Sequence, residues 1–175
     1  MRRLYLLRHA KTEPGEPGKP DRNRALTERG ESDAGTIGAY MESHALIPDR
    51  VALSSSLRTQ RTWKLMAAAM RATPQAVTAD GIYIAAASDI FDFIRDTPAD
   101  TGSLMILGHN PTLHEVALTL VATGDIDTRE RLREGLPTMG LVVIDFAFDA
   151  WKKLHPQSGR LERFVTPKSL DPATR

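Results

Sequence analysis

Three short apolar runs, each followed directly by charged or polar residues, restrict the fold of this sequence more than any other feature. The runs span residues 4–7, 51–53 and 103–107. The segments that follow them are Arg8-His9, residues 54–58 and Gly108-His109. Short apolar runs are typical of strands that enter a core, and helical patterns separate these three. Because strands that alternate with helices build parallel sheets, we predict an α/β fold with a mostly parallel central sheet.

Capping residues and apolar spacing predict where the other elements begin and end. Thr27 and Asn110 are favoured N-cap types, and Pro111 fits the first position of a helix. We predict helices after Thr27, over residues 57–70, after Ser88 as N-cap, and from Asn110-Pro111 onward with Val121 on the apolar face. Further strands are predicted near Val77, over residues 140–148 and over residues 161–165.

The composition narrows the classes of function. Hydrophobic residues make up 41% of the chain and charged residues 26%, which is an ordinary globular balance. The net charge is +1, so no overall field favours binding to nucleic acid or to a membrane surface. The sequence contains no cysteine, which excludes disulfides, thiolate nucleophiles and cysteine–zinc sites. We expect residues 1–175 to form a single domain.

The location of the protein is predicted from its apolar segments. The first apolar run ends at Arg8 after four residues, residues 4–7, whereas the apolar region of a signal peptide needs roughly seven to fifteen. No stretch approaches the roughly 18 apolar residues of a membrane helix. We therefore expect a cytoplasmic protein that binds no membrane and no nucleic acid.

The polar segments after the three strands are predicted to converge. In open α/β sheets, ligands bind beyond the carboxyl ends of the strands. Arg8, His9, Arg58 and His109 would meet at this edge and form an anion site. A guanidinium stays charged and binds phosphate through two parallel hydrogen bonds, and a helix that begins near Pro111 adds free backbone N–H groups. This is a phosphate site that needs no metal and no cofactor.

One of the two histidines can act as a nucleophile on phosphorus. A neutral imidazole nitrogen attacks and yields a phosphohistidine intermediate. Nearby arginines lower the pKa of the attacking ring, because a second positive charge is unfavourable there. The other histidine, when protonated, stabilises the negative oxygens of the transition state.

These motifs resemble those of a known family. Residues 4–11, LYLLRHAK, resemble the strand followed by Arg-His-Gly/Ala of the histidine phosphatase superfamily. Residues 54–62, SSSLRTQRT, resemble its Ser-x-x-x-Arg-x-x-Gln-Thr element, and residues 108–111, GHNP, resemble its Gly-His-x-x element. Order and spacing agree across all three motifs. The short length and residues 21–30, DRNRALTERG, look most like the SixA-type branch, which removes phosphate from phosphohistidine in signalling proteins.

The resemblance implies a fold and a set of roles. The fold would be a three-layer α/β/α arrangement similar to phosphoglycerate mutase. His9 would accept the phosphoryl group, and Arg8, Arg58 and His109 would clamp the phosphate. Asn110 is a further candidate ligand of the phosphate, and Lys11 either reaches the phosphate or points to solvent. The partner would be a phosphorylated protein or a small phosphorylated molecule.

One departure from the family pattern bears on the substrate. Mutases and phosphomonoesterases of the superfamily usually carry a glutamate as general acid, which would fall within residues 82–87, and that stretch holds no carboxylate. An ester leaving group needs a proton from a positioned acid, whereas a phosphorylated imidazole needs less help. The missing glutamate favours a P–N substrate. Asp80 and Asp89 flank the stretch and could substitute for the glutamate, and Asp21 is a further candidate proton carrier on a loop.

Two alternatives to a phosphohistidine phosphatase stay open from the sequence. The chain is either a phosphatase of a small phosphate ester, or a module that binds phosphorylated partners without turnover. A pure binder has no need of a nucleophile, which argues against the module. Relative rates on a phosphorylated histidine peptide and on esters separate the two enzymes.

Overall fold

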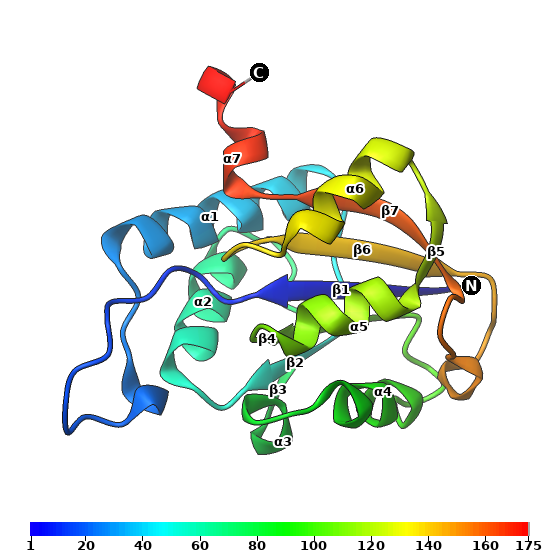
Figure 1. The fold of residues 1–175 in the computed structure, drawn as a ribbon, viewed down its shortest axis with the longest axis horizontal. Coiled ribbons are helices and arrows are strands. Elements are labelled where there is room, and N and C mark those ends of the chain that lie inside the picture. The colour runs from blue at the N-terminus through cyan, green and yellow to red at the C-terminus, as the bar shows by residue number, and fades with distance from the viewer. Residues whose placement is uncertain (175) are drawn as a thin grey trace.

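A seven-stranded sheet forms the centre of the computed structural model, which describes residues 1–174 (Figure 1). The strand order is β3-β2-β4-β1-β6-β7-β5. The strands are β1 (Arg2–Arg8), β2 (Arg50–Ser54), β3 (Gln75–Ala79), β4 (Ser103–Gly108), β5 (Val121–Gly124), β6 (Leu141–Phe146) and β7 (Gly159–Val165).

The sheet is mostly parallel, as predicted. β1 pairs in parallel with β4, and β2 pairs in parallel with both β3 and β4. β6 is antiparallel to its neighbours β1 and β7, and β5 again runs parallel to β7. The carboxyl ends of β1, β2 and β4 therefore lie at one edge of the sheet, where the polar segments begin.

Helices cover both faces of the sheet, which gives the three-layer α/β/α arrangement (Figure 1). The α-helices are α1 (Glu28–Ser43), α2 (Leu57–Ala68), α3 (Asp80–Tyr83), α4 (Ala87–Arg95), α5 (Thr112–Leu120), α6 (Ile126–Glu134) and α7 (Pro167–Leu170). Short 3-10 helices are η1 (Asp21–Asn23), η2 (Trp151–Lys153) and η3 (Pro172–Thr174). α1 and α2 pack on one face, and α4 and α5 pack on the other.

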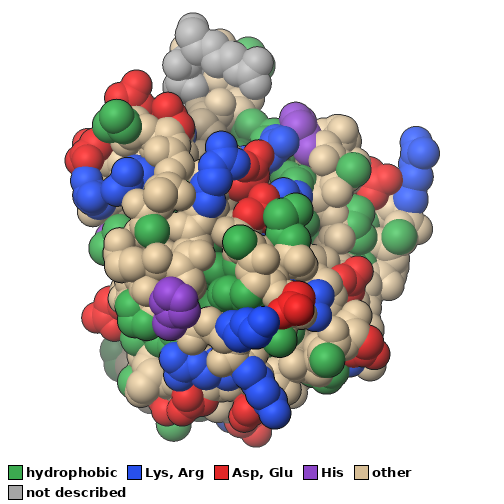
Figure 2. All heavy atoms as spheres, turned by 90° about the vertical axis from the view of Figure 1, so that its right-hand side faces the viewer, with side chains coloured by type: hydrophobic (Ala, Val, Ile, Leu, Met, Phe, Trp, Pro, Cys, Tyr) green, Lys and Arg blue, Asp and Glu red, His purple; other side chains and the backbone are tan. Residues whose placement is uncertain are grey.

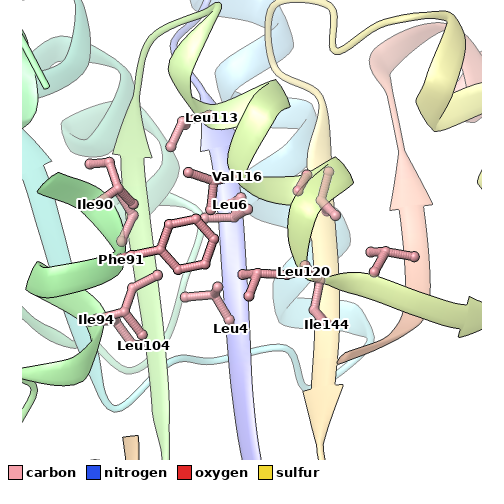
Figure 3. Packing of buried hydrophobic residues seen from close by; sticks show 14 of the residues in the cluster. Leu4, Leu6, Ile90, Phe91, Ile94, Leu104, Leu113, Val116, Leu120 and Ile144 are labelled. Carbon is pink, nitrogen blue, oxygen red and sulfur yellow. The ribbon is translucent and has the colours of Figure 1, made fainter. Parts of the chain in front are cut away.

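Alternation along β1 divides the core between the two faces. Leu4 and Leu6 pack against α4 and α5 together with residues such as Phe91 and Val116 (Figure 3). Tyr5 and Leu7 face α1 and α2 in a second hydrophobic cluster. A strand that is apolar on both faces belongs in the middle of a sheet that helices cover on both sides. This burial fixes the end of β1, and with it the position of His9.

Two predicted helix starts are wrong by one or two residues. Ser88 is not the N-cap of α4, because the Asp89 carboxylate accepts the backbone N–H of Ala86 at 2.8 Å and moves the start to Ala87. Pro111, not Asn110, is the N-cap of α5. The Asn110 side chain instead donates to the carbonyl of Leu136 at 2.7 Å.

The segment between α5 and β6 differs most from the prediction. Val121 does not belong to the apolar face of α5 but begins β5, because it pairs with Gly159 of β7. The sequence predicts no helix where α6 lies, and of the residues of α6 Leu132 alone is buried. A helix with one buried side chain leaves almost no apolar period in its sequence.

α2 also ends at Ala68, two residues before the predicted Met70.

Candidate active site

The three polar segments meet at the carboxyl edge of the sheet. Arg8 and Gly108 are register partners at the ends of β1 and β4, and the backbone N–H of His9 donates to the Gly108 carbonyl at 3.1 Å. The ring centroids of His9 and His109 lie 5.2 Å apart. Arg58 stands in the first turn of α2, directly after β2. Two imidazoles and a guanidinium from three distant segments therefore share one site.

His9 is held as a neutral ring with one defined free nitrogen. Its side chain is buried, and Nδ1 lies 2.8 Å from the carbonyl oxygen of Ala10. A carbonyl oxygen only accepts, so Nδ1 carries the hydrogen and Nε2 keeps its lone pair. Burial lowers the pKa of His9 from 6.5 to about 3, and the charges of His109, Arg58 and Arg8 act in the same direction. Neutrality at pH 7 is what an attack on phosphorus requires.

His109 stands across the site with a different partner. Its Nε2 lies 2.6 Å from the hydroxyl oxygen of Ser54, the last residue of β2. Burial, followed by the charges of Arg58 and Arg8, lowers the pKa of His109 from 6.5 to about 4 against the raising effect of Asp21. The ring is therefore neutral at pH 7 in this arrangement, and its Nδ1 has no hydrogen-bond partner among residues 1–174. Contrary to the sequence expectation, burial contributes more than the arginines to both pKa shifts.

Arg58 reaches the site from a helix with a well-defined start. Ser56 caps α2 by accepting the backbone N–H of Thr59. Arg58 is only 7% exposed, so its guanidinium is fixed against the site. Nη1 donates to the Asp21 carbonyl at 3.0 Å, and Nη2 donates to an Asp21 carboxylate oxygen at 3.1 Å.

Asp21 links a polar loop to the site. η1 places its carboxylate where it accepts from the Tyr83 hydroxyl at 2.8 Å and from Arg58. The hydrogen bond from Tyr83, followed by those from Arg24 and Arg58, lowers the pKa of Asp21 to about 2. Asp21 is therefore ionised in this arrangement and cannot act as a proton donor. The neighbouring Arg22 pairs with Asp80 and holds the same loop to the start of α3.

Arg8 and Asn110 share one anchor. The Leu136 carbonyl accepts from Arg8 Nη1 at 3.1 Å and from Asn110 Nδ2 at 2.7 Å. The backbone N–H of Met139 also donates to the Arg8 carbonyl, so this loop before β6 is attached to the end of β1. Lys11, the remaining candidate, has an exposed side chain.

Polar atoms without partners gather at this site. Among residues 1–174, five buried side-chain polar atoms lack a hydrogen bond, and one of them, in Arg2, lies elsewhere. The other four are Arg8 Nε, Arg58 Nε, His109 Nδ1 and Asn110 Oδ1. A buried polar atom without a partner costs free energy, so such a cluster in a native protein points to a ligand. Two of these atoms are guanidinium donors, which suits an anion with several oxygens.

The residues that the structure describes form neither a candidate metal centre nor a membrane-spanning helix. Within the described part of the chain, no three His, Asp or Glu side chains are grouped so that they could hold a metal ion. No helix among residues 1–174 has the length and apolar character needed to cross a membrane.

Sequence reasoning missed Tyr83 and the partner of His109. Tyr83 lies within residues 82–87, where other members of the superfamily are expected to carry a glutamate. Its ring meets that of His109 edge-on, with 5.6 Å between the centroids, and Arg22 lies over its face. An isolated tyrosine carries no sequence signal of this role. Ser54 was visible as the first residue of the second motif, but its contact with His109 depends on the pairing of β2 with β4.

Known proteins similar to this chain agree with its motifs and fold. Residues 4–80 match the model of the histidine phosphatase superfamily, branch 1. A candidate phosphohistidine phosphatase, SixA from Agrobacterium tumefaciens, is 29% identical, with a TM-score of 0.80 over 95% of this chain and 98% of that one. A protein histidine phosphatase SixA complexed with tungstate has a TM-score of 0.75 at 14% identity over 97% and 99% of the two chains, which shows a shared fold. An uncharacterized protein of Mycobacterium tuberculosis, Rv1276c, is 28% identical over 93% of this chain and all of its own length.

Proposed function

We propose, from the premise that this chain belongs to the histidine phosphatase superfamily and is a phosphatase, that it hydrolyses phosphohistidine on proteins through a phosphohistidine intermediate at His9. The observation that carries the proposal is the neutral His9 ring with a free Nε2, opposite guanidinium and imidazole nitrogens that lack partners. A nucleophile and an anion clamp stand together, which is what phosphoryl transfer requires.

In the first step, His9 Nε2 forms a bond to phosphorus while the P–N bond of the substrate breaks. The leaving imidazole departs neutral, because its ring is protonated before cleavage. Arg8, Arg58 and His109 donate hydrogen bonds to the phosphoryl oxygens and stabilise the charge that spreads over them. Asn110 orients Arg8 through their shared carbonyl.

In the second step, water attacks phosphorus, and the bond between His9 and phosphorus breaks. The water loses a proton as its oxygen bonds to phosphorus. Asp21 is ionised and lies against Arg58, so it is our candidate for the group that accepts a hydrogen bond from this water, while the proton itself ends on an oxygen of the released phosphate. His9 Nε2 regains its lone pair, and phosphate leaves.

The surroundings of the missing glutamate favour a P–N substrate over an ester. Asp80 is paired with Arg22, and hydrogen bonding to Ser55 together with Arg22 lowers its pKa. The Asp89 carboxylate is engaged with the backbone N–H of Ala86. Both flanking carboxylates already have partners in the fold, so neither is positioned as the acid that an alkoxide leaving group requires.

Trapping of the intermediate tests this proposal. The protein is mixed with a radiolabelled phosphohistidine peptide, quenched, and mapped for label. We expect label on His9, none in His9→Ala, and full labelling in His155→Ala, an exposed histidine outside the site. Turnover is expected to persist in the presence of a chelator. Faster turnover of p-nitrophenyl phosphate than of the peptide would replace phosphohistidine by an ester as substrate, and phosphate binding without any turnover would indicate a binding module.

A further inference from the structure

A groove lies beside the proposed phosphate site. It encloses about 890 Å³ and is bounded by the last turn of α6, the loop over residues 135–137, the end of β7 and α7. Arg8 and Asn110 line it, and both belong to the site described above. Since β7 runs parallel to β1, its end and the start of α7 lie at the same edge of the sheet as His9. A molecule whose phosphoryl group bonds to His9 can therefore extend into this groove.

The groove carries more positive than negative charge. Its cations are Arg8 at the phosphate end, Arg131 on α6 and Lys168 on α7, and its one carboxylate is that of Glu134. The chain as a whole has a net charge of only +1, so this is a local excess. Charged groups on one surface favour a ligand of the opposite sign and speed its approach.

Arg131 is held in place before any ligand arrives. Its guanidinium lies 5.7 Å from the centroid of the Phe164 ring and donates to the Phe164 carbonyl at 3.3 Å. His114 connects α5 to α6 through the Leu132 carbonyl at 2.7 Å, and this contact fixes the wall that carries Arg131. A cation fixed over an aromatic floor loses less entropy on binding than a free side chain.

The shape and the spacing of the charges indicate what kind of ligand enters. The groove is open to solvent, whereas pockets for small molecules bury most of the ligand around converging polar groups. The three cations stand on three separate elements, β1, α6 and α7, so they are spread along the walls of the groove. Resting on the proposed phosphatase activity, we infer that the groove binds an acidic segment of the polypeptide that carries the phosphorylated histidine.

Kinetics on matched substrates test this inference. One phosphohistidine peptide has aspartate and glutamate around the phosphorylated residue, a second has glutamine in their place, and free phosphohistidine is the third substrate. In the double variant Arg131→Gln/Lys168→Gln we expect the KM for the acidic peptide to rise about tenfold with kcat unchanged. The rate on free phosphohistidine should not change. The control Arg133→Gln/Lys152→Gln removes the same charge outside the groove and should leave all three rates as they are.

A binding measurement separates failure of the groove from failure of the phosphatase proposal. A fluorescent acidic peptide without phosphate is titrated with the wild-type protein and both double variants, with anisotropy as the readout. Weaker binding to the groove variant alone supports the inference even if no phosphohistidine substrate is hydrolysed. Equal binding of the acidic and glutamine peptides overturns it. Displacement of the acidic peptide by equimolar citrate, lost in the groove variant, would also overturn it by assigning the groove to small anions.

Discussion

Two arginine–aspartate pairs lie at opposite ends of the sheet and differ in how fully the arginine is hydrogen-bonded. At the amino end, Arg3 of β1 and Asp145 of β6 are register partners joined by two hydrogen bonds of 2.6 and 2.7 Å. At the carboxyl edge, one side-chain bond of 3.1 Å joins Arg58 to Asp21, and Arg58 Nε has no partner among residues 1–174.

The surroundings of the two pairs differ as well. Around the amino end, which faces the viewer in Figure 2, basic and acidic side chains are interspersed. Arg3 is 32% exposed at its side chain, whereas that of Arg58 is 8% exposed. A saturated pair between strands holds a sheet together, while a buried guanidinium with spare donors is available to a ligand.

Replacing Arg58 or Arg3 by lysine is expected to give the largest difference in activity between the two ends of the sheet. Arg58→Lys keeps the charge but loses the planar fork, so kcat/KM on a phosphohistidine peptide should fall on the order of 100-fold. Arg3→Lys, the matched control, should leave kcat/KM within about twofold. Steady-state kinetics on both purified variants check this. Equal activity of the two variants would remove Arg58 from the phosphate clamp.

Acid should weaken the fold through the carboxyl edge. His9 and His109 have pKa values of about 3 and 4 in the folded protein, below their ordinary 6.5. Below pH 6.5 the unfolded chain therefore binds more protons at these two histidines than the folded protein does. The free energy of unfolding is therefore insensitive to these histidines above pH 6.5 and falls as the pH drops toward 3. Urea titrations at pH 7 and pH 4.5 measure the loss, and His9→Gln should reduce it. An unchanged loss in that variant would contradict the low pKa of His9.

The amino-end pair should affect stability without affecting catalysis. Asp145→Asn removes one charge of the two-bond contact, and we expect a loss of about 1 kcal/mol because the pair is only partly buried. Chemical denaturation gives the stability, and turnover of the phosphohistidine peptide should stay at the wild-type rate. A fall in turnover with unchanged stability would mean that this pair acts on the site.

Removing the charge of Asp21 should change the affinity for inorganic phosphate only slightly, and the direction of the change shows how Asp21 acts on the site. Asp21 is a half-exposed carboxylate on Arg58, where it repels an incoming anion. In Asp21→Asn the inhibition constant of inorganic phosphate should therefore fall about threefold. A higher constant would show that Asp21 supports the anion site by orienting Arg58.

Most of the strands, and the convergence of four polar residues at one edge of the sheet, could be predicted from sequence because each depends on a local signal. The apolar run of β1 places Arg8 and His9 at its end, and the end of β4 places His109 beside them. No local signal exists for β5, whose pairing depends on β7 much later in the chain.

The position of Asp21 also could not be predicted, because it depends on where a proline-rich and glycine-rich loop settles. That loop meets Arg58 and Tyr83, which stand on two other elements. Contacts between distant segments decide its conformation, and they leave no periodic pattern.

The Leu136 carbonyl connects the proposed phosphate site to the groove beside it. It holds both Arg8 and Asn110, and the loop that carries it also forms a wall of the groove. Anything that shifts this loop moves both side chains at once. Linkage is reciprocal, so a groove occupant that strengthens phosphoryl binding must itself be held more tightly when a phosphoryl group is present. A phosphorylated polypeptide would then engage more strongly than its two halves taken separately, and release of the phosphoryl group would loosen the polypeptide as well.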